Sequence, residues 1–204
     1  MEDYLQASEV IDCQHPSITG LAQKIASQYQ TQEAIAKACF EWVRDEIYHS
    51  CDYQINRITC CASEVLKHKT GLCYAKSHLL AALLRTNGIP VGFCYQRLSI
   101  DGLGAPYSLH GFNAIYLPAS GWYRVDARGN RQGINAQFTP PVEQLAYKIQ
   151  VPGEAEFENI CSEPLPVVVQ GLQAYSSLDD LGFQLPDVSL ESLEQYGLIL
   201  RHKA

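Results

Sequence analysis

Three residues of the chain have types and a spacing suited to covalent acyl transfer. Cys73 begins a segment with a helical pattern, His110 opens a strand-like segment, and Asp126 closes the next one. A thiolate can attack a carbonyl carbon, an imidazole can take up and return the proton, and a carboxylate can orient the imidazole. The sequence therefore offers a nucleophile, a base and an orienting acid, provided that the fold brings them together.

The segment of residues 73–87 predicts a helix that is buried on nearly all sides. Its apolar residues cover most of the circumference, and only a narrow stripe through Tyr74, His78 and Arg85 is polar. A cysteine in the first turn of a helix meets unpaired backbone N–H groups and the positive end of the helix dipole, which favour a thiolate. The alternative for Cys73 is ordinary packing as one more buried thiol.

Two aromatic and β-branched segments, residues 110–117 and 122–126, predict the strands that position the other two residues. The turn between them is short enough for a hairpin. In a hairpin with nearly matched ends, His110 and Asp126 share one face near the same edge, because directly opposed residues point the same way. Asp126 would then accept a hydrogen bond from one ring nitrogen of His110 and leave the other nitrogen to face the cysteine.

The elements that must hold this site are helices first and strands later, which predicts an α+β fold. No repeat and no change of composition divides the chain, so we expect a single domain over residues 1–204, with a core at about 31–130 and an extension at 131–204 packed on it. The other expected elements are helices at 17–30, from Thr31 to about Ile47, at 62–68 and at 190–196, and strands at 91–98, 144–151 and 165–169.

Composition excludes several classes of protein. The chain has 204 residues, of which 47% are hydrophobic and 18% charged, and that charged share is too low for charge-driven disorder. Its net charge of −7 argues against nucleic acid and anionic membranes as partners, because both reward clustered Lys and Arg. No span-length apolar run and no signal-peptide pattern is visible, so we expect no membrane partner and a cytoplasmic location.

The eight cysteines are expected to be reduced thiols, mostly buried, since nothing in the sequence indicates export. A loose cluster of His49, Cys51, Cys60 and Cys61 leaves a thiol-based metal or redox protein open as another hypothesis. Zinc sites have tighter paired spacings than this cluster, so we expect no metal and no cofactor.

Two segments of the chain resemble the transglutaminase-like superfamily. TGLCYAKSHLLAALLRTNGIPVGFCYQ resembles the family's Gly-x-Cys segment and central helix, and HGFNAIYLPASGWYRVDARGN resembles its His strand, Gly-Trp turn and Asp strand. The match covers about residues 40–130, with order and spacing in agreement. It implies a papain-like fold, in which the Cys helix packs on an antiparallel sheet. It also implies Cys73 as nucleophile, His110 as general base and Asp126 as orienting acid.

The chain departs from the family pattern just after the cysteine. An aromatic or acidic residue often stands there in the family, whereas Tyr74, Ala75 and Lys76 follow Cys73 here. Lys76 could help to hold a thiolate, but we expect it to extend along the surface to solvent. The family's second oxyanion donor comes from upstream of the nucleophile. The candidates in this chain are Trp42, Gln54 and Asn56.

The sequence thus predicts a cysteine-dependent acyl-transfer enzyme that acts on a peptide or protein amide through a thioacyl intermediate. Hydrolysis is favoured over cross-linking because nothing in the sequence indicates an amine site. The loop of residues 99–109 is the candidate wall of the substrate site, since loops on rigid scaffolds commonly carry specificity. A catalytically inactive binding or scaffold domain of the same fold is the main alternative. The oligomeric state is not predicted.

Overall fold

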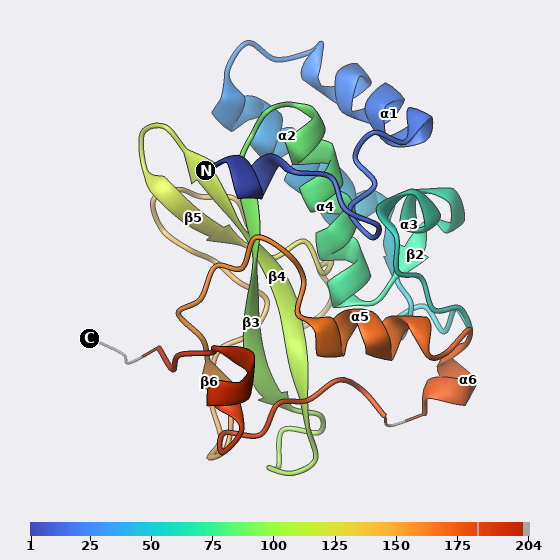
Figure 1. The fold of residues 1–204 in the computed structure, drawn as a ribbon, viewed down its shortest axis with the longest axis vertical. Helices are drawn as coiled ribbons and strands as arrows, with labels where there is room; N and C mark the ends of the chain where they lie inside the picture. Colours follow the sequence, from blue (N-terminus) through green and yellow to red (C-terminus); the bar gives the residue numbers. More distant parts are fainter. Residues whose placement is uncertain (183, 202–204) are drawn as a thin grey trace.

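A computed structural model describes residues 1–182 and 184–201, and it has the expected α+β architecture (Figure 1). A four-stranded antiparallel sheet has the strand order β5-β4-β3-β6. The helices are α1 (Pro16–Ala26), α2 (Gln32–Glu46), α3 (Ala62–His68), α4 (Cys73–Thr86), α5 (Pro166–Gln173) and α6 (Leu178–Leu181), with 3₁₀ helices at Glu2–Leu5 and Leu193–Tyr196. The strands are β1 (Tyr48–His49), β2 (Thr70–Gly71), β3 (Val91–Ser99), β4 (Tyr107–Leu117), β5 (Gly121–Val125) and β6 (Ala155–Glu156).

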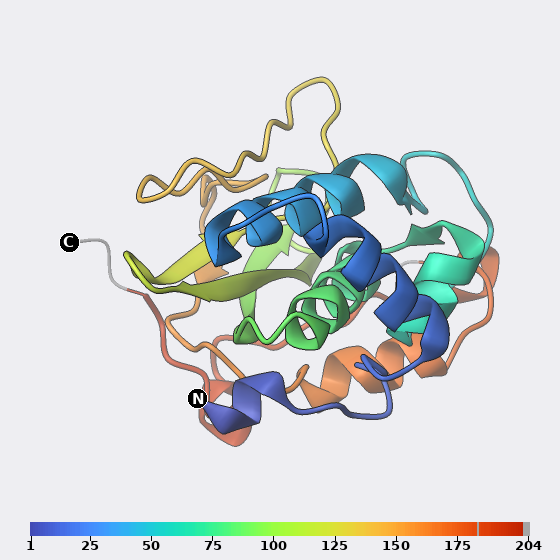
Figure 2. The same ribbon diagram turned by 90° about the horizontal axis from the view of Figure 1, so that it is seen from above.

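Helix α4 lies at the centre of the molecule. Every residue from Cys73 to Arg85 is buried, which confirms the all-round burial predicted from the pattern. The helix packs against α1, α2 and α3 on one side and against β3 and β4 on the other (Figures 1 and 2). Its polar stripe is buried too, because the protein supplies partners: His78 Nδ1 lies 2.8 Å from the Cys60 carbonyl, and Arg85 donates to backbone carbonyls.

The hairpin of β4 and β5 has the antiparallel register needed to bring its two ends together. Asn113 pairs with Val125 and Leu117 with Gly121. Strand β4 begins at Tyr107, three residues earlier than expected, because its pairing with β3 extends to Ser99. His110 therefore lies inside the strand rather than at its mouth.

The expectations for the chain beyond residue 140 were partly wrong. Residues 144–151 do not form a strand; Gln144 makes one isolated bridge to Gln137. Residues 165–169 are the start of helix α5, not a strand. Pro166 occupies a first-turn position, where its fixed φ favours a helix, and Val168 and Leu172 face the core four residues apart. The helix expected at 190–196 is only a 3₁₀ turn.

The C-terminal residues contribute side chains to the main core. Strand β6 extends the sheet beside β3, and Phe157 N–H donates to the Tyr95 carbonyl. The buried apolar residues beyond residue 130 that join the same cluster as helix α4 are Phe138, Ala155, Phe157, Leu165, Val168, Leu172, Leu181, Val188, Leu193 and Leu198. Within the residues that the structure describes, no helix combines the length and the apolar character needed to cross a bilayer.

Replacement of Phe157 by alanine tests whether residues 131–204 fold together with the rest. The Phe157 side chain is 1% exposed, so Phe157→Ala should lower the free energy of unfolding by about 3–5 kcal/mol. The nearby Ile199 is 58% exposed, and Ile199→Ala should change the free energy by less than about 0.5 kcal/mol. Urea denaturation followed by circular dichroism measures both. An unchanged main transition in Phe157→Ala would show that the C-terminal segment unfolds separately.

Candidate active site

Cys73 is the first residue of helix α4 and follows directly from the two-stranded parallel pair of β1 and β2. In that pair Tyr48 lies opposite Thr70 and His49 opposite Gly71. The N-cap residue is Leu72, whose extended backbone turns the chain into the helix and whose side chain has no acceptor atom. The first-turn N–H groups are therefore not capped by that side chain, and they face the region of the Cys73 sulfur.

His110 and Asp126 are joined by a hydrogen bond of 2.7 Å between His110 Nε2 and Asp126 Oδ2. The register of the hairpin places the two residues diagonally on one face, because Asp126 follows the last paired residue of β5. The hairpin argument therefore predicted the contact, although the residues are not directly opposed. With Nε2 engaged by the carboxylate, Nδ1 is the ring nitrogen left for the nucleophile.

Asp126 is fully buried, and its charge is stabilised by three donors. Besides His110, the backbone N–H of Arg128 donates to Oδ1 and that of Ala146 to Oδ2, both at 3.1 Å. Burial alone raises the pKa of Asp126, but the charge of His110 and these hydrogen bonds hold it below its usual value. The carboxylate is thus ionised near neutral pH and fixed in orientation.

Cys73 and His110 are close enough to interact through charge and hydrogen bonding. Burial alone lowers the pKa of His110, but the charges of Asp126 and the Cys73 thiolate, with hydrogen bonds to both, raise it to about 10. The imidazole therefore holds a proton near neutral pH. The arrangement is suited to a thiolate–imidazolium pair, with the Cys73 side chain buried but still 9% exposed.

Tyr147 packs on the imidazole and Arg128 packs on Tyr147, and neither contact was expected. The Tyr147 ring stands at a right angle to the His110 ring, with 4.8 Å between centroids, and burial raises the pKa of Tyr147 to about 12. Arg128 lies over the Tyr147 ring and forms a bidentate pair with Asp52 at 2.6 and 2.9 Å. Arg128 comes shortly after the Asp126 strand, and its position in the sequence favours bracing of the turn over contact with a peptide carbonyl. No local signal marks Tyr147, which lies in a segment without regular structure.

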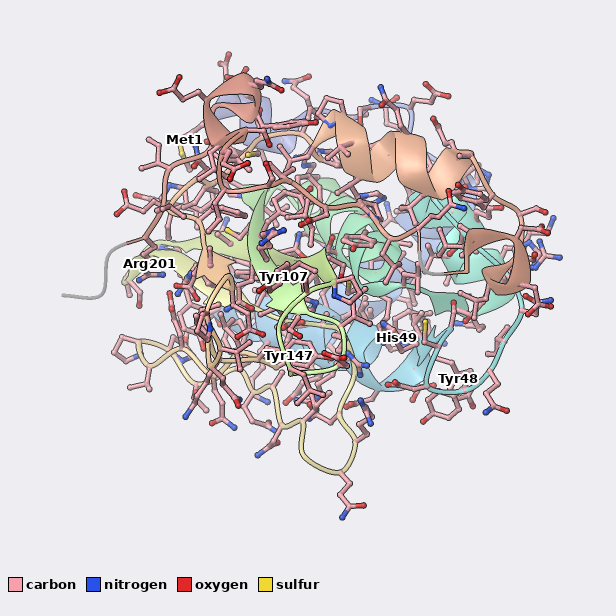
Figure 3. The ribbon with its side chains drawn as sticks, turned by 90° about the horizontal axis from the view of Figure 1, so that it is seen from below. Met1, Tyr48, His49, Tyr107, Tyr147 and Arg201 are labelled. Atoms are coloured by element: carbon pink, nitrogen blue, oxygen red, sulfur yellow. The ribbon has the colours of Figure 1, made fainter. Side chains whose placement is uncertain are left out.

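His49 is a second buried histidine of the site. Burial, followed by the positive charge of Arg128, lowers the pKa of His49 far below its ordinary value. The positive charges of Lys76 and His110 lower it as well. Its Nδ1 atom has no hydrogen-bond partner among the described residues. His49 and Tyr147 lie on the same face of the molecule (Figure 3). The sequence pattern had suggested His49 only as part of a metal cluster.

Lys76 does not reach solvent, so the expectation that it extends to the surface was wrong. Its side chain is fully buried, and its ammonium donates to the carbonyls of Ile47 and, at 3.2 Å, of Arg44. Helix α4 is covered on this side by the C-terminal end of α2, whose free carbonyls accept the protons. A side chain at Gly129 would meet Lys76 Nζ at 3.3 Å, and Gly129 has a positive φ of 114°. Burial lowers the pKa of Lys76 to about 7.

One of the expected oxyanion donors is engaged elsewhere, because the amide of Asn56 donates to Asp179. Trp42 is half-buried, and the ammonium of Lys69 lies 4.2 Å from the centre of its ring. Gln54 is exposed in a turn with φ of 52°. Trp42 and Gln54 stay predictions for the second donor.

A cavity of about 1360 Å³ adjoins the site without enclosing the thiol. Ala146 and Tyr147, which flank Asp126 and His110, line one part of it, whereas Cys73 does not line it. Its remaining walls include the ion pairs of Arg124 with Glu143 and Glu156. Among the described residues, no group of three or more His, Cys, Asp and Glu side chains is arranged to hold a metal ion.

Comparison with models of known protein families finds a match over the first part of the chain. The model of the transglutaminase-like superfamily matches residues 19–127, more than half of the chain. No curated protein sequence matches the chain significantly.

Among the solved structures that are similar to the chain, two serve for comparison. A candidate cysteine protease from Cytophaga hutchinsonii has a TM-score of 0.50 at 18% identity, over 61% of this chain and 40% of its own. The periplasmic domain of TgpA from Pseudomonas aeruginosa has a TM-score of 0.44 at 20% identity, over 61% and 45%. The chain spans less than half the length of either structure, and at these identities the likeness concerns the fold alone.

Replacement of Lys76 by methionine should remove a pH dependence of stability. The pKa of Lys76 is about 7 in the folded protein and near 10.5 when exposed, so the unfolded chain binds more protons between these values. Above pH 7, the free energy of unfolding of the wild type should therefore rise relative to that of Lys76→Met, by at most about 1.4 kcal/mol per pH unit. Below pH 7, the difference between the two free energies should stay constant. Denaturation at pH 6, 8 and 9 measures this. The exposed Lys24→Met is the control, and a wild type that stays parallel to Lys76→Met throughout would contradict the lowered pKa.

Proposed function

Because the chain belongs to the transglutaminase-like superfamily, we propose that it is a cysteine-dependent acyl-transfer enzyme acting on amide groups of peptides or proteins. The observation that carries the proposal is the buried hydrogen bond between His110 and Asp126, beside a cysteine at a helix N-terminus. A buried carboxylate that orients an imidazole toward a thiol is the arrangement that nucleophilic catalysis by cysteine requires.

In the proposed reaction the Cys73 thiolate attacks the carbonyl carbon, and a C–S bond forms as the carbonyl oxygen takes up negative charge. Backbone N–H groups at the start of α4, with that of Cys73 first among them, are the proposed donors to this oxyanion. The His110 imidazolium then gives its proton to the leaving nitrogen, and the C–N bond breaks. A thioacyl enzyme and a free amine result.

The thioacyl enzyme is resolved by an acceptor whose proton returns to His110. We favour water as the acceptor, since no side chain of the site suggests binding of a second amine. The exposed loop of residues 100–106 leads into the strand of His110 and is the proposed wall of the substrate site. A cytoplasmic location, in which the eight thiols stay reduced, remains a prediction.

Selective alkylation tests the nucleophile and needs no substrate. Cys51 is the exposed cysteine and Cys73 is 9% exposed, so exposure alone predicts that Cys51 reacts first. If the thiolate is favoured at Cys73, this residue should react at least about tenfold faster with limiting iodoacetamide at pH 7 than Cys51 does. Peptide mapping by mass spectrometry measures both rates. A catalytically inactive scaffold domain predicts the order of exposure instead, and slow labelling of Cys73 would overturn the proposal.

The role of Asp126 is tested by Asp126→Asn. The variant keeps the shape but removes the charge that raises the pKa of His110, so this pKa should fall well below about 10. Imidazole ¹⁵N NMR titration measures it. Acylation by an activated peptide ester should slow by at least about tenfold, or 1.4 kcal/mol, and by about a hundredfold or more in His110→Ala.

The exposed Asp3→Asn is the matched control, and it should leave both the titration and the rate unchanged. Acylation within about threefold of the wild type in both Asp126→Asn and His110→Ala would show that the base lies elsewhere.

A further inference from the structure

A second thiol is placed beside Cys73 by the pairing of β1 and β2. The two strands are parallel, and each residue of β1 lies opposite the residue 22 positions later, as Tyr48–Thr70 and His49–Gly71 show (70 − 48 = 71 − 49 = 22). The pairing ends at His49 and Gly71; residues 50–54 form a turn, and Cys73 begins helix α4. Cys51 and Cys73 each follow the last paired residue of their strand by two positions, so both stand just beyond the same end of the parallel pair.

The residues on both sides of Cys51 are fixed to the site. Ser50 continues the pairing, since its N–H donates to the Gly71 carbonyl at 3.2 Å and its hydroxyl lies 3.0 Å from that of Thr70. Asp52 is held by the bidentate pair with Arg128, whose own N–H donates to Asp126. Cys51 thus lies between Ser50, which is hydrogen-bonded to Gly71 just before Cys73, and Asp52, which is paired with Arg128.

The electrostatics of Cys51 agree with this placement. Cys51 is exposed as a residue, but its sulfur is partly buried. This partial burial, followed by the negative charge of Cys73, raises the pKa of Cys51. Both thiols also contribute to the field at Tyr74, the residue after Cys73. Of the eight cysteines, all within the described part of the chain, Cys51 alone is exposed.

We propose that Cys51 is a resolving thiol, which forms a reversible disulfide with Cys73 when a peroxide oxidises the site. The disulfide would silence Cys73 and protect it from irreversible oxidation. The proposed function enters only through the reactivity of the Cys73 thiolate, because no acyl transfer is involved.

The oxidation proceeds in two balanced steps. The Cys73 thiolate attacks one oxygen of hydrogen peroxide, the O–O bond breaks, and a sulfenic acid and hydroxide form. The Cys51 sulfur then attacks the Cys73 sulfur, the S–S bond forms, and the departing hydroxide takes up a proton to become water. Two thiols and one peroxide therefore give one disulfide and two waters. The sulfenic acid is neutral, so the negative charge of Cys73, one of the causes that raise the pKa of Cys51, disappears before the second step.

The disulfide can be identified without ambiguity in a tryptic digest. Cleavage after Arg44, Arg57, Lys69 and Lys76 gives peptides 45–57 and 70–76, and each contains one cysteine, Cys51 or Cys73. The full chain is treated with equimolar hydrogen peroxide, free thiols are blocked, and the digest is kept non-reducing. We expect the linked peptide pair, a fall from eight free thiols to six, and loss of Cys73 alkylation that dithiothreitol restores.

Cys51→Ser supplies the decisive comparison. Before oxidation its Cys73 should alkylate within about twofold of the wild-type rate, because Cys51 has no part in the proposed reaction. After peroxide its Cys73 should accumulate as sulfinic acid, and dithiothreitol should not restore alkylation. Cys61→Ser, at a partly buried thiol, is the matched control and should behave as the wild type does.

The two readouts separate the inference from the proposed function. Slow alkylation of Cys73 in the untreated protein would overturn the proposed function. Absence of the linked pair, or equal accumulation of sulfinic acid in wild type and Cys51→Ser, would overturn the role of Cys51 and leave the nucleophile in place.

Discussion

Complete burial of helix α4 is the constraint on which the rest of the structure depends. A helix that has side chains in the core from Cys73 to Arg85 must be covered by helices and by the sheet at once. Its polar side chains must then find partners inside the protein, as His78 and Lys76 do on backbone carbonyls. Because the helix is packed on all sides, its first residue has a fixed position. The Cys73 sulfur is therefore presented from a rigid element, at the end where the helix dipole and free N–H groups favour negative charge.

Buried charge is the second organising feature, and it is tolerated because each charge is matched. Asp126 lies in the interior with three donors, and one of them is the imidazole that faces the thiol. Arg128 continues the network from Asp126 to Asp52, so the turn after β1 is tied to the same group that orients His110. Loss of one partner would leave an uncompensated buried charge, which costs far more than the pair contributes. The network therefore ties the geometry of the reacting groups to the stability of the fold.

The site also draws on parts of the chain that lie far apart in sequence. Strand β1 reaches the nucleophile from upstream, and the segment after β5 supplies the Ala146 N–H and the Tyr147 ring from downstream. The family model ends at residue 127, yet these downstream groups complete the surroundings of Asp126 and His110. The C-terminal residues are thus part of the environment that sets the pKa of the imidazole, besides their contribution to the core.

Local patterns in the sequence were sufficient to predict the core of the fold and the contact between His110 and Asp126. Three features depend on residues close in the chain, where periodicity and turn length are informative: the apolar circumference of residues 73–86, the hairpin at 107–125, and the parity of His110 and Asp126.

The surroundings of the site depended on tertiary structure. Lys76 has the side chain of a surface residue, yet it is buried because the end of α2 supplies carbonyl acceptors. Residues 165–169 have a strand-like composition, yet they form a helix because their burial follows a helical period against the core. Burial and charge pairing depend on neighbours that come from the whole chain. The pKa of His110 and the positions of His49, Cys51 and Tyr147 therefore follow only from the tertiary structure.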